Sequence, residues 1–326
     1  MSKKIHTQAI KRTPNKRNTK TASKSQGRSR HMQPSRSEEP HELLNKNSKY
    51  PRCLTDILPD MDETYTGRKC QTYIFEKAAI AYYIADKIIK DGSSAFFDAG
   101  STLRIVTRAT YIRAKKRGLK LIITTNNFDI SDDFMSKGKP YSLDEPSANI
   151  DVILQLTGGK HDRQHHALFG RLAAFTLDRI YPECIFMGIT GFSFRKGLFY
   201  HGATEEEAIK RALYSKEVDR RVLAFDHSKL GQLDMFLCEN NEGEAIEGLC
   251  KNVRDKTIVV TSEPYDEEDE SKGKQPWYQQ ELEDIPRNSF VQDALNKGKL
   301  EIIVVSFVEE DPYYRLERRF PSADST

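Results

Sequence analysis

Small, polar and charged residues follow several short apolar segments of this sequence, and their types suit the binding of a small anionic molecule. The first group is the segment Asp-Ala-Gly-Ser-Thr that runs from Asp98 to Thr102. Gly100 would let a ligand approach the backbone. Ser101 and Thr102 would offer hydroxyls and amides at the start of a helix, where the helix dipole favours a phosphate. The alternative interpretation is an ordinary helix cap on a tight turn.

Three further groups of this kind occur along the chain. They are Thr125 with Asn126, Gly158 with Gly159, and the segment from Asp226 to Lys229. Lys229 could reach a phosphate as a point charge, and Asp226 could accept hydrogen bonds from sugar hydroxyls. A lone lysine at such a position is more often a solvated surface residue. The prediction of a ligand site therefore depends on the succession of four groups and not on any one of them.

The apolar segments that carry these groups are predicted to be the strands of one sheet. Strands are expected at 94–98, 119–125, 151–157, 183–188, 221–226, 257–262 and 300–306. Helices are expected at 75–89, from the segment after Thr102 to about 116, at 168–180, from 204 onward and at 280–297. A loop or ribbon is expected at 191–202. This alternation predicts an α/β protein with a mostly parallel sheet and helices on both faces. Because ligands bind beyond the carboxyl ends of the strands in such sheets, the four groups are expected at one edge.

The first 49 residues differ in composition from the rest of the chain. Residues 1–37 contain eleven Lys or Arg residues and no acidic residue, whereas the remainder has 40 basic and 48 acidic residues. Because no hydrophobic period is present, we predict a disordered basic arm over 1–49. Its cations could attract nucleic-acid phosphates through counterion release. The candidates are Lys11, Arg12, Lys16, Arg17, Arg28 and Arg30. The alternative is a solubilising tail or a transit-like segment.

Composition disfavours several other classes of protein. No apolar run approaches the roughly 20 residues of a membrane helix, and no apolar segment typical of a secretory signal follows the basic start. We therefore expect a cytoplasmic protein without membrane association. The five cysteines include no C-x-x-C pair, which argues against a zinc ribbon. His161 and His165 could share a metal on a helix, but a polar loop is the preferred prediction, and neither a metal nor a cofactor is expected.

A series of motifs occurs in a fixed order between residues 66 and 307. They are Glu76-Lys77-x-x-Ile80-Ala81, Asp98 to Thr102, Thr125-Asn126, Gly158-Gly159 followed by Gly170, Gly188-x-x-Gly191, Lys210-Arg211-Ala212 and Asp226-x-Ser228-Lys229. In order and spacing this set resembles the effector-sensing domain of the DeoR family of bacterial transcription regulators. The resemblance implies a fold like that of ribose-5-phosphate isomerase and CoA transferases.

The same resemblance implies an effector that is a phosphorylated sugar or a related metabolite phosphate. It further implies that the phosphate is faced by Ser101, Thr102 and Lys229, and that the sugar is surrounded by Asp98, Asn126 and the Gly158-Gly159 turn. Two features depart from the family pattern. Members carry a winged helix-turn-helix before the sensing domain, whereas residues 1–65 show only the basic arm and a connector over 50–65. Residues 129–150 also form a longer polar insertion.

We therefore predict a sensing domain over 66–307 and a C-terminal tail over 308–326. The favoured function is a non-catalytic sensor that binds a phosphorylated metabolite and responds with a change of oligomeric or partner state, and a homo-oligomer is expected. DNA would be contacted through the basic arm or through a partner chain. Two alternatives stay open. The first is a phosphosugar isomerase or hydrolase of the same fold, in which the three consecutive glutamates at 205–207 could supply a base. The second is a nucleic-acid-binding accessory protein that uses the arm.

Overall fold

The computed structural model describes residues 52–58, 65–136, 151–200, 204–233, 235–236, 242–265 and 276–320. The basic arm predicted at 1–49, half of the connector and most of the polar insertion lie outside these residues. In the described part of the chain, no helix is long and apolar enough to cross a membrane.

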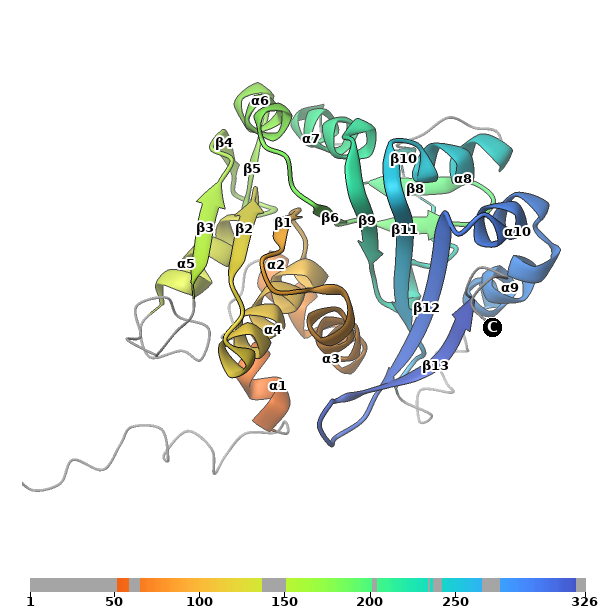
Figure 1. Ribbon diagram of the computed structural model, residues 1–326, viewed down its shortest axis with the longest axis horizontal. Helices are drawn as coiled ribbons and strands as arrows, with labels where there is room; N and C mark the ends of the chain where they lie inside the picture. Colours follow the sequence, from red (N-terminus) through yellow and green to blue (C-terminus); the bar gives the residue numbers. More distant parts are fainter. Residues whose placement is uncertain are drawn as a thin grey trace, which may run out of the picture. The chain divides into compact units, whose positions relative to one another are not determined.

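The central element is an eight-stranded sheet with the order β13-β12-β11-β9-β6-β1-β2-β3 (Figure 1). Its strands are β1 (Ser94–Phe97), β2 (Leu121–Thr125), β3 (Val152–Leu156), β6 (Cys184–Met187), β9 (Val218–Ala224), β11 (Val253–Ser262), β12 (Leu300–Phe307) and β13 (Tyr314–Phe320). All neighbouring pairs are parallel except β12 and β13, which are antiparallel. The predicted α/β class with a mostly parallel sheet is confirmed.

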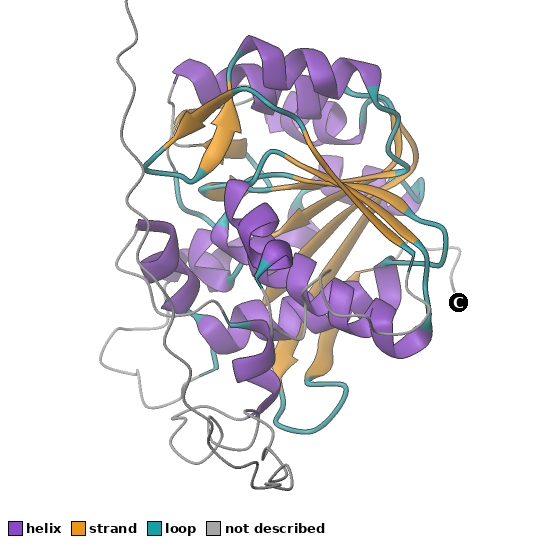
Figure 2. Cartoon of the chain, turned by 90° about the vertical axis from the view of Figure 1, so that its left-hand side faces the viewer, coloured by secondary structure: helices purple, strands orange, loops and turns teal. Residues whose placement is uncertain are grey.

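Helices cover both faces of this sheet (Figure 2). One face carries α1 (Arg52–Ile57), α3 (Ile74–Tyr83), α4 (Ser101–Arg117) and α5 (Phe128–Met135), with α2 (Tyr65–Gln71) packed against α4. The other face carries α6 (Arg171–Arg179), α7 (Thr204–Ser215), α8 (Glu242–Cys250), α9 (Pro276–Asp284) and α10 (Ser289–Asn296). Successive residues of a strand point to opposite faces, so Phe97 lies in the first core and Phe96 in the second. Burial on both faces explains why the strands read as continuous apolar runs.

Two small sheets lie beside the central one. The segment expected as a loop or ribbon forms β7 (Gly191–Ser193) and β8 (Gly197–Tyr200), which pair with each other. β8 also pairs with β10 (Met235–Phe236). A hairpin of β4 (Lys160–Asp162) and β5 (Ala167–Phe169) precedes α6. This hairpin is not predicted from the sequence, because each strand is only three residues long and β4 consists of a lysine, a histidine and an aspartate.

Three boundaries differ from the sequence-based expectation. The helix expected at 280–297 is divided into α9, a 3-10 turn (Ile285–Arg287) and α10. Pro286 lies inside that turn and Asn288 caps α10, its Oδ1 accepting hydrogen bonds from the next turn's backbone. Within the expected C-terminal tail, 314–320 form β13 on the sheet edge. Within the expected connector, Leu54 and Ile57 of α1 are fully buried in the core.

A buried arginine on β9 fixes the helix that later contributes to the site. Arg221 is fully buried, and its guanidinium donates hydrogen bonds to the carbonyl oxygens of Tyr214 (2.6 Å) and Leu249 (2.6 Å). It also reaches the carbonyls of Lys216 and Lys251, both at 3.2 Å. These carbonyls belong to the C-terminal ends of α7 and α8, where helices leave acceptors unpaired and where a positive charge is favourable. One side chain therefore holds both helix ends against the sheet.

Candidate functional site

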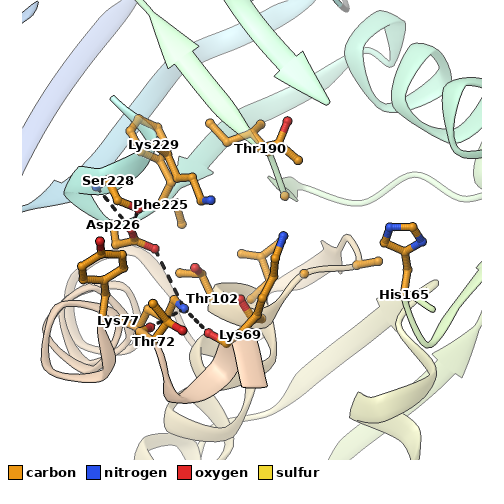
Figure 3. Close-up of a pocket in the computed structure, with 18 of the residues that line it drawn as sticks. Lys69, Thr72, Lys77, Thr102, His165, Thr190, Phe225, Asp226, Ser228 and Lys229 are labelled. Carbon is orange, nitrogen blue, oxygen red and sulfur yellow. Dashed lines mark hydrogen bonds and ion pairs between the residues drawn. The ribbon is translucent and has the colours of Figure 1, made fainter. Parts of the chain in front are cut away.

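A cavity of about 240 Å³ opens at the carboxyl ends of β1, β6 and β9 (Figure 3). Its wall is built from α2 and the turn after it, the β1–α4 turn, the segments after β6 and β9, one side of α7 and the β4–β5 hairpin. The lining residues with polar side chains or glycine backbones are Lys69, Thr72, Tyr73, Lys77, Gly100, Ser101, Thr102, His165, Gly188, Thr190, Glu206, Lys210, Asp226, Ser228 and Lys229. This volume lies just below the range of drug-sized pockets and suits a small metabolite.

The β1–α4 turn points the start of a long helix at this cavity. Gly100 has a φ of 149°, in the region that favours glycine, and it directly precedes α4. The first helical hydrogen bond of α4 runs from Arg104 N to the Gly100 carbonyl. The backbone amides of 101–103 therefore precede the helical ladder, and all three residues line the cavity. The positive end of the helix dipole adds to their attraction for an anion.

Two lysines bring positive charge to the same space. Lys229 follows β9, Lys69 belongs to α2, and Figure 3 shows both side chains extending into the cavity from different walls. Asp226 is the carboxylate on this side, and it is engaged already. Its Oδ1 accepts hydrogen bonds from the backbone amide of Ser228 at 3.2 Å and from the Ser228 hydroxyl. The cavity therefore offers an anion two ammonium groups and a helix N-terminus.

A third lysine is buried behind them and fastens α2. Lys77 is 3% exposed, and its Nζ donates hydrogen bonds to the carbonyls of Thr72 (2.6 Å) and Lys69. Asp226 Oδ2 lies 4.0 Å from the same nitrogen. Burial lowers the pKa of Lys77, and the carboxylate of Asp226 opposes that effect. Lys77 thus joins the end of α2, which carries Lys69, to the segment after β9.

A buried ion pair lies under the cavity and joins three elements. Asp98 is fully buried; its Oδ1 accepts a hydrogen bond from Ala99 N, and its Oδ2 accepts from Gly188 N (3.1 Å) and Lys210 Nζ (2.5 Å). Lys210 also donates to the Gly188 carbonyl at 2.7 Å. Burial alone lowers the pKa of Lys210, but the carboxylates of Asp98 and Glu206 outweigh it and the net shift is upward. Lys210 is therefore held as an ammonium ion that links β1, β6 and α7.

The structure brings together some of the residues predicted from sequence and separates others. Those that line the cavity are Gly100, Ser101, Thr102, Asp226 and Lys229. Asp98 lies beneath them with both oxygens in use. Thr125 ends β2, Asn126 directly follows it, and Gly158 and Gly159 follow β3, but these four residues are not part of the cavity wall.

Thr125 instead connects β2 to β1, whereas Asn126 and Gly159 contact the β4–β5 hairpin. The Thr125 hydroxyl donates a hydrogen bond to the Phe97 carbonyl at 2.6 Å, and the Asn126 carbonyl accepts one from Leu168 N at 2.7 Å. A Cβ at Gly159 would lie 2.6 Å from the Phe169 carbonyl, so this glycine permits close packing of the hairpin. In this arrangement the Gly-Gly turn serves chain packing.

Several lining residues were not predicted as site residues. Lys69 lies on α2, which is too short to show a hydrophobic period, and His165 lies on the unpredicted hairpin, where its Nδ1 is 3.0 Å from Asp162 Oδ1. Lys77 and Lys210 occur in the motifs quoted above, and a lysine on the apolar face of a helix is a signal that could have identified them. In the described part of the chain, no group of three His, Cys, Asp or Glu residues is placed to hold a metal ion.

Comparison with known proteins assigns the chain to a family. The family model described as the DeoR C terminal sensor domain matches residues 73–243. The chain belongs to this family, and the assignment made from its motifs is confirmed.

Two regulators and one solved structure are among the proteins to which this chain is similar. The HTH-type transcriptional repressor GlcR of Bacillus subtilis (strain 168) is 24% identical over 186 residues, which cover 55% of this chain and 62% of GlcR. The HTH-type transcriptional regulator GolR of Listeria innocua is 25% identical over 184 residues, covering 53% and 65% of the two chains. The match therefore spans less than two thirds of either regulator. Ribose 5-phosphate isomerase A from Methanocaldococcus jannaschii aligns over 47% of this chain and 52% of its own, with a TM-score of 0.31 and 18% identity.

Proposed function

We propose that this domain binds a phosphorylated sugar or a related small metabolite phosphate in the cavity described above, and that occupancy regulates transcription or a partner protein. The observation that carries the proposal is the convergence of Lys69, Lys229 and the N-terminus of α4 on one cavity. A phosphate at this point would receive charge-assisted hydrogen bonds from the two ammonium groups. Each such bond contributes about 1.5–3 kcal/mol. The amides of 101–103 complete the set of donors.

We propose a regulatory and not a catalytic role. Membership of a sensor-domain family and the names of the two related regulators support it. The buried lysines support it as well. Lys210 is committed to Asp98 and the Gly188 carbonyl, and Lys77 to two carbonyls of α2 and its turn. Both amines therefore stabilise the walls of the cavity. Turnover of a phosphosugar, as by an isomerase or hydrolase, would be detected in the ligand titration and would contradict a purely regulatory role.

The position of α2 suggests how occupancy could reach the rest of the protein. This helix supplies Lys69 to the cavity and is fastened by Lys77 to the segment after β9. A phosphate held between Lys69 and Lys229 would bridge α2 to the sheet. We propose that this bridge changes how residues preceding α2 engage DNA, through the basic arm or a partner chain, in a cytoplasmic homo-oligomer.

The experiment is a ligand titration by calorimetry and thermal unfolding. Inorganic phosphate, glucose 6-phosphate, fructose 6-phosphate and ribose 5-phosphate are compared with the corresponding unphosphorylated sugars. We expect saturable heat and stabilisation with the phosphates only, of about 2.7 kcal/mol when the ligand is present at a hundred times its Kd. Phosphorus NMR of the same mixtures should reveal no product. Equal responses to phosphorylated and free sugars would contradict the proposal, and conversion of one phosphate into another would favour the isomerase alternative.

A further inference from the structure

The cavity also contains a buried carboxylate whose hydrogen bonding is incomplete. Glu206 of α7 lines the cavity and is only 7% exposed. Its Oε1 lies 3.6 Å from Lys210 Nζ, whereas its Oε2 has no hydrogen-bond partner among the described residues. The hydroxyl of Thr190, which lines the same cavity, is also buried without a partner in that part of the chain. Two unpaired polar groups thus belong to residues that line one small cavity.

The neighbouring lysine cannot complete the bonding of Glu206. An ammonium group has three hydrogens, and Lys210 directs them to Asp98 Oδ2 at 2.5 Å, to the Gly188 carbonyl at 2.7 Å and toward Glu206 Oε1. Nothing is left for Oε2. Leaving a buried charged acceptor unpaired is costly, and nearly all buried polar groups in native proteins are paired. A donor that enters with a ligand would supply the missing bond.

We propose that Glu206 is a specificity-determining residue that accepts a hydrogen bond from a hydroxyl of the bound ligand. This inference rests on the proposed function, because it assumes that the phosphate end occupies the space between Lys69 and Lys229. It narrows the ligand to phosphorylated polyols and sugars. A phosphorylated carboxylic acid would place a second anion beside the buried Glu206 carboxylate, where the repulsion between the two charges is screened less than in bulk water.

Paired ligands test this preference in the unmodified protein. Glycerol 3-phosphate and 3-phosphoglycerate differ at one end, a hydroxymethyl group in the first and a carboxylate in the second, and sorbitol 6-phosphate and 6-phosphogluconate form a longer pair of the same kind. We expect each polyol phosphate to bind at least tenfold more tightly than its acid partner and more tightly than inorganic phosphate. Acid partners that bind as tightly as the polyols, or polyols no better than inorganic phosphate, would overturn the inference.

Substitution of the carboxylate provides the second test. Glu206→Gln keeps the shape of the side chain and removes its charge. It should weaken binding of the polyol phosphates about tenfold, because the amide oxygen that remains is a neutral and weaker acceptor than the carboxylate. It should also narrow the difference in affinity between the polyol phosphates and their acid partners. The matched control is Glu205→Gln, because the neighbouring Glu205 is exposed, pairs with Lys160 and does not line the cavity.

The outcomes separate this inference from the function on which it rests. If inorganic phosphate and every phosphorylated ligand fail to bind the unmodified protein, the proposed function itself is wrong. If they bind but Glu206→Gln and the unmodified protein have equal Kd values for the polyol phosphates, only the role of Glu206 is wrong. Should the variant fail to fold, as far-UV dichroism would reveal, the paired ligands still decide the question.

Discussion

Replacement of Lys229 by alanine should weaken phosphate binding without affecting the fold. The Lys229 side chain extends into the cavity and is partly exposed, and its backbone amide, which the substitution keeps, bonds to the Asp226 carbonyl at 3.0 Å. The expected loss is one charge-assisted hydrogen bond, about 1.5–3 kcal/mol. In an affinity measurement this corresponds to a Kd raised roughly 10- to 150-fold.

Calorimetric titration with glucose 6-phosphate and with inorganic phosphate measures this loss directly. The Lys297→Ala variant is a suitable control, because the exposed Lys297, at the C-terminal end of α10, pairs with Asp293 at 2.7 Å and does not line the cavity. Lys229→Arg keeps the charge and should recover part of the affinity. Because part of the interaction is Coulombic, the difference between Lys229→Ala and the unmodified protein should shrink as salt rises. Equal Kd values for the Lys229→Ala variant and the control would refute the phosphate assignment.

Three further predictions concern stability and coupling. Arg221→Met should lower the free energy of unfolding in urea by at least about 3 kcal/mol, because four carbonyls lose a buried donor; a loss below 1 kcal/mol would mean that the capping role is unimportant. The Arg113 guanidinium lowers the pKa of Asp311 to about 2, below its unfolded value of about 4, so this pair stabilises the fold fully above pH 4 and its contribution is lost as pH falls through 2. Asp311→Asn should flatten that acid dependence by at most about 1 kcal/mol, since the carboxylate is 45% exposed, and an unchanged slope would count against the assignment. Saturation with glucose 6-phosphate should slow amide hydrogen exchange in 65–73; exchange that is indifferent to ligand would exclude a bridge through α2.

The strands were predictable because burial on both faces leaves an unbroken apolar run, as in β9 and β12. Elements with other patterns were not. The middle five residues of β13 are exposed and mostly charged, so its sequence predicts a polar tail. The strand nevertheless pairs along most of β12. The division of α9 from α10 depends on Pro286, whose breaking effect is visible in sequence, and on a cap at Asn288 that is clear only once the backbone is known.

The site residues could be predicted only where the segment that follows a strand also lines the cavity. Asp98 to Thr102 and Asp226 to Lys229 follow β1 and β9, which flank β6 in the sheet, so their turns meet over one cavity. Thr125 ends β2 and Gly159 follows β3, but the Thr125 hydroxyl bonds to the Phe97 carbonyl of β1, and Gly159 packs closely against the β4–β5 hairpin. Strand order and the hairpin depend on long-range contacts that motif spacing does not contain. The same holds for Lys69, whose helix reaches the cavity only through the tertiary fold.

A crystal structure of the protein with glucose 6-phosphate bound tests the central claim most directly. Hydrogen-bond distances from the phosphoryl oxygens to Lys229 Nζ and to the backbone amides of Ser101 and Thr102 are the quantities to measure. The account predicts contacts of about 2.7–3.2 Å to all three. A phosphoryl group bound elsewhere on the molecule, or a sugar end occupying the space between Lys69 and Lys229, would contradict it.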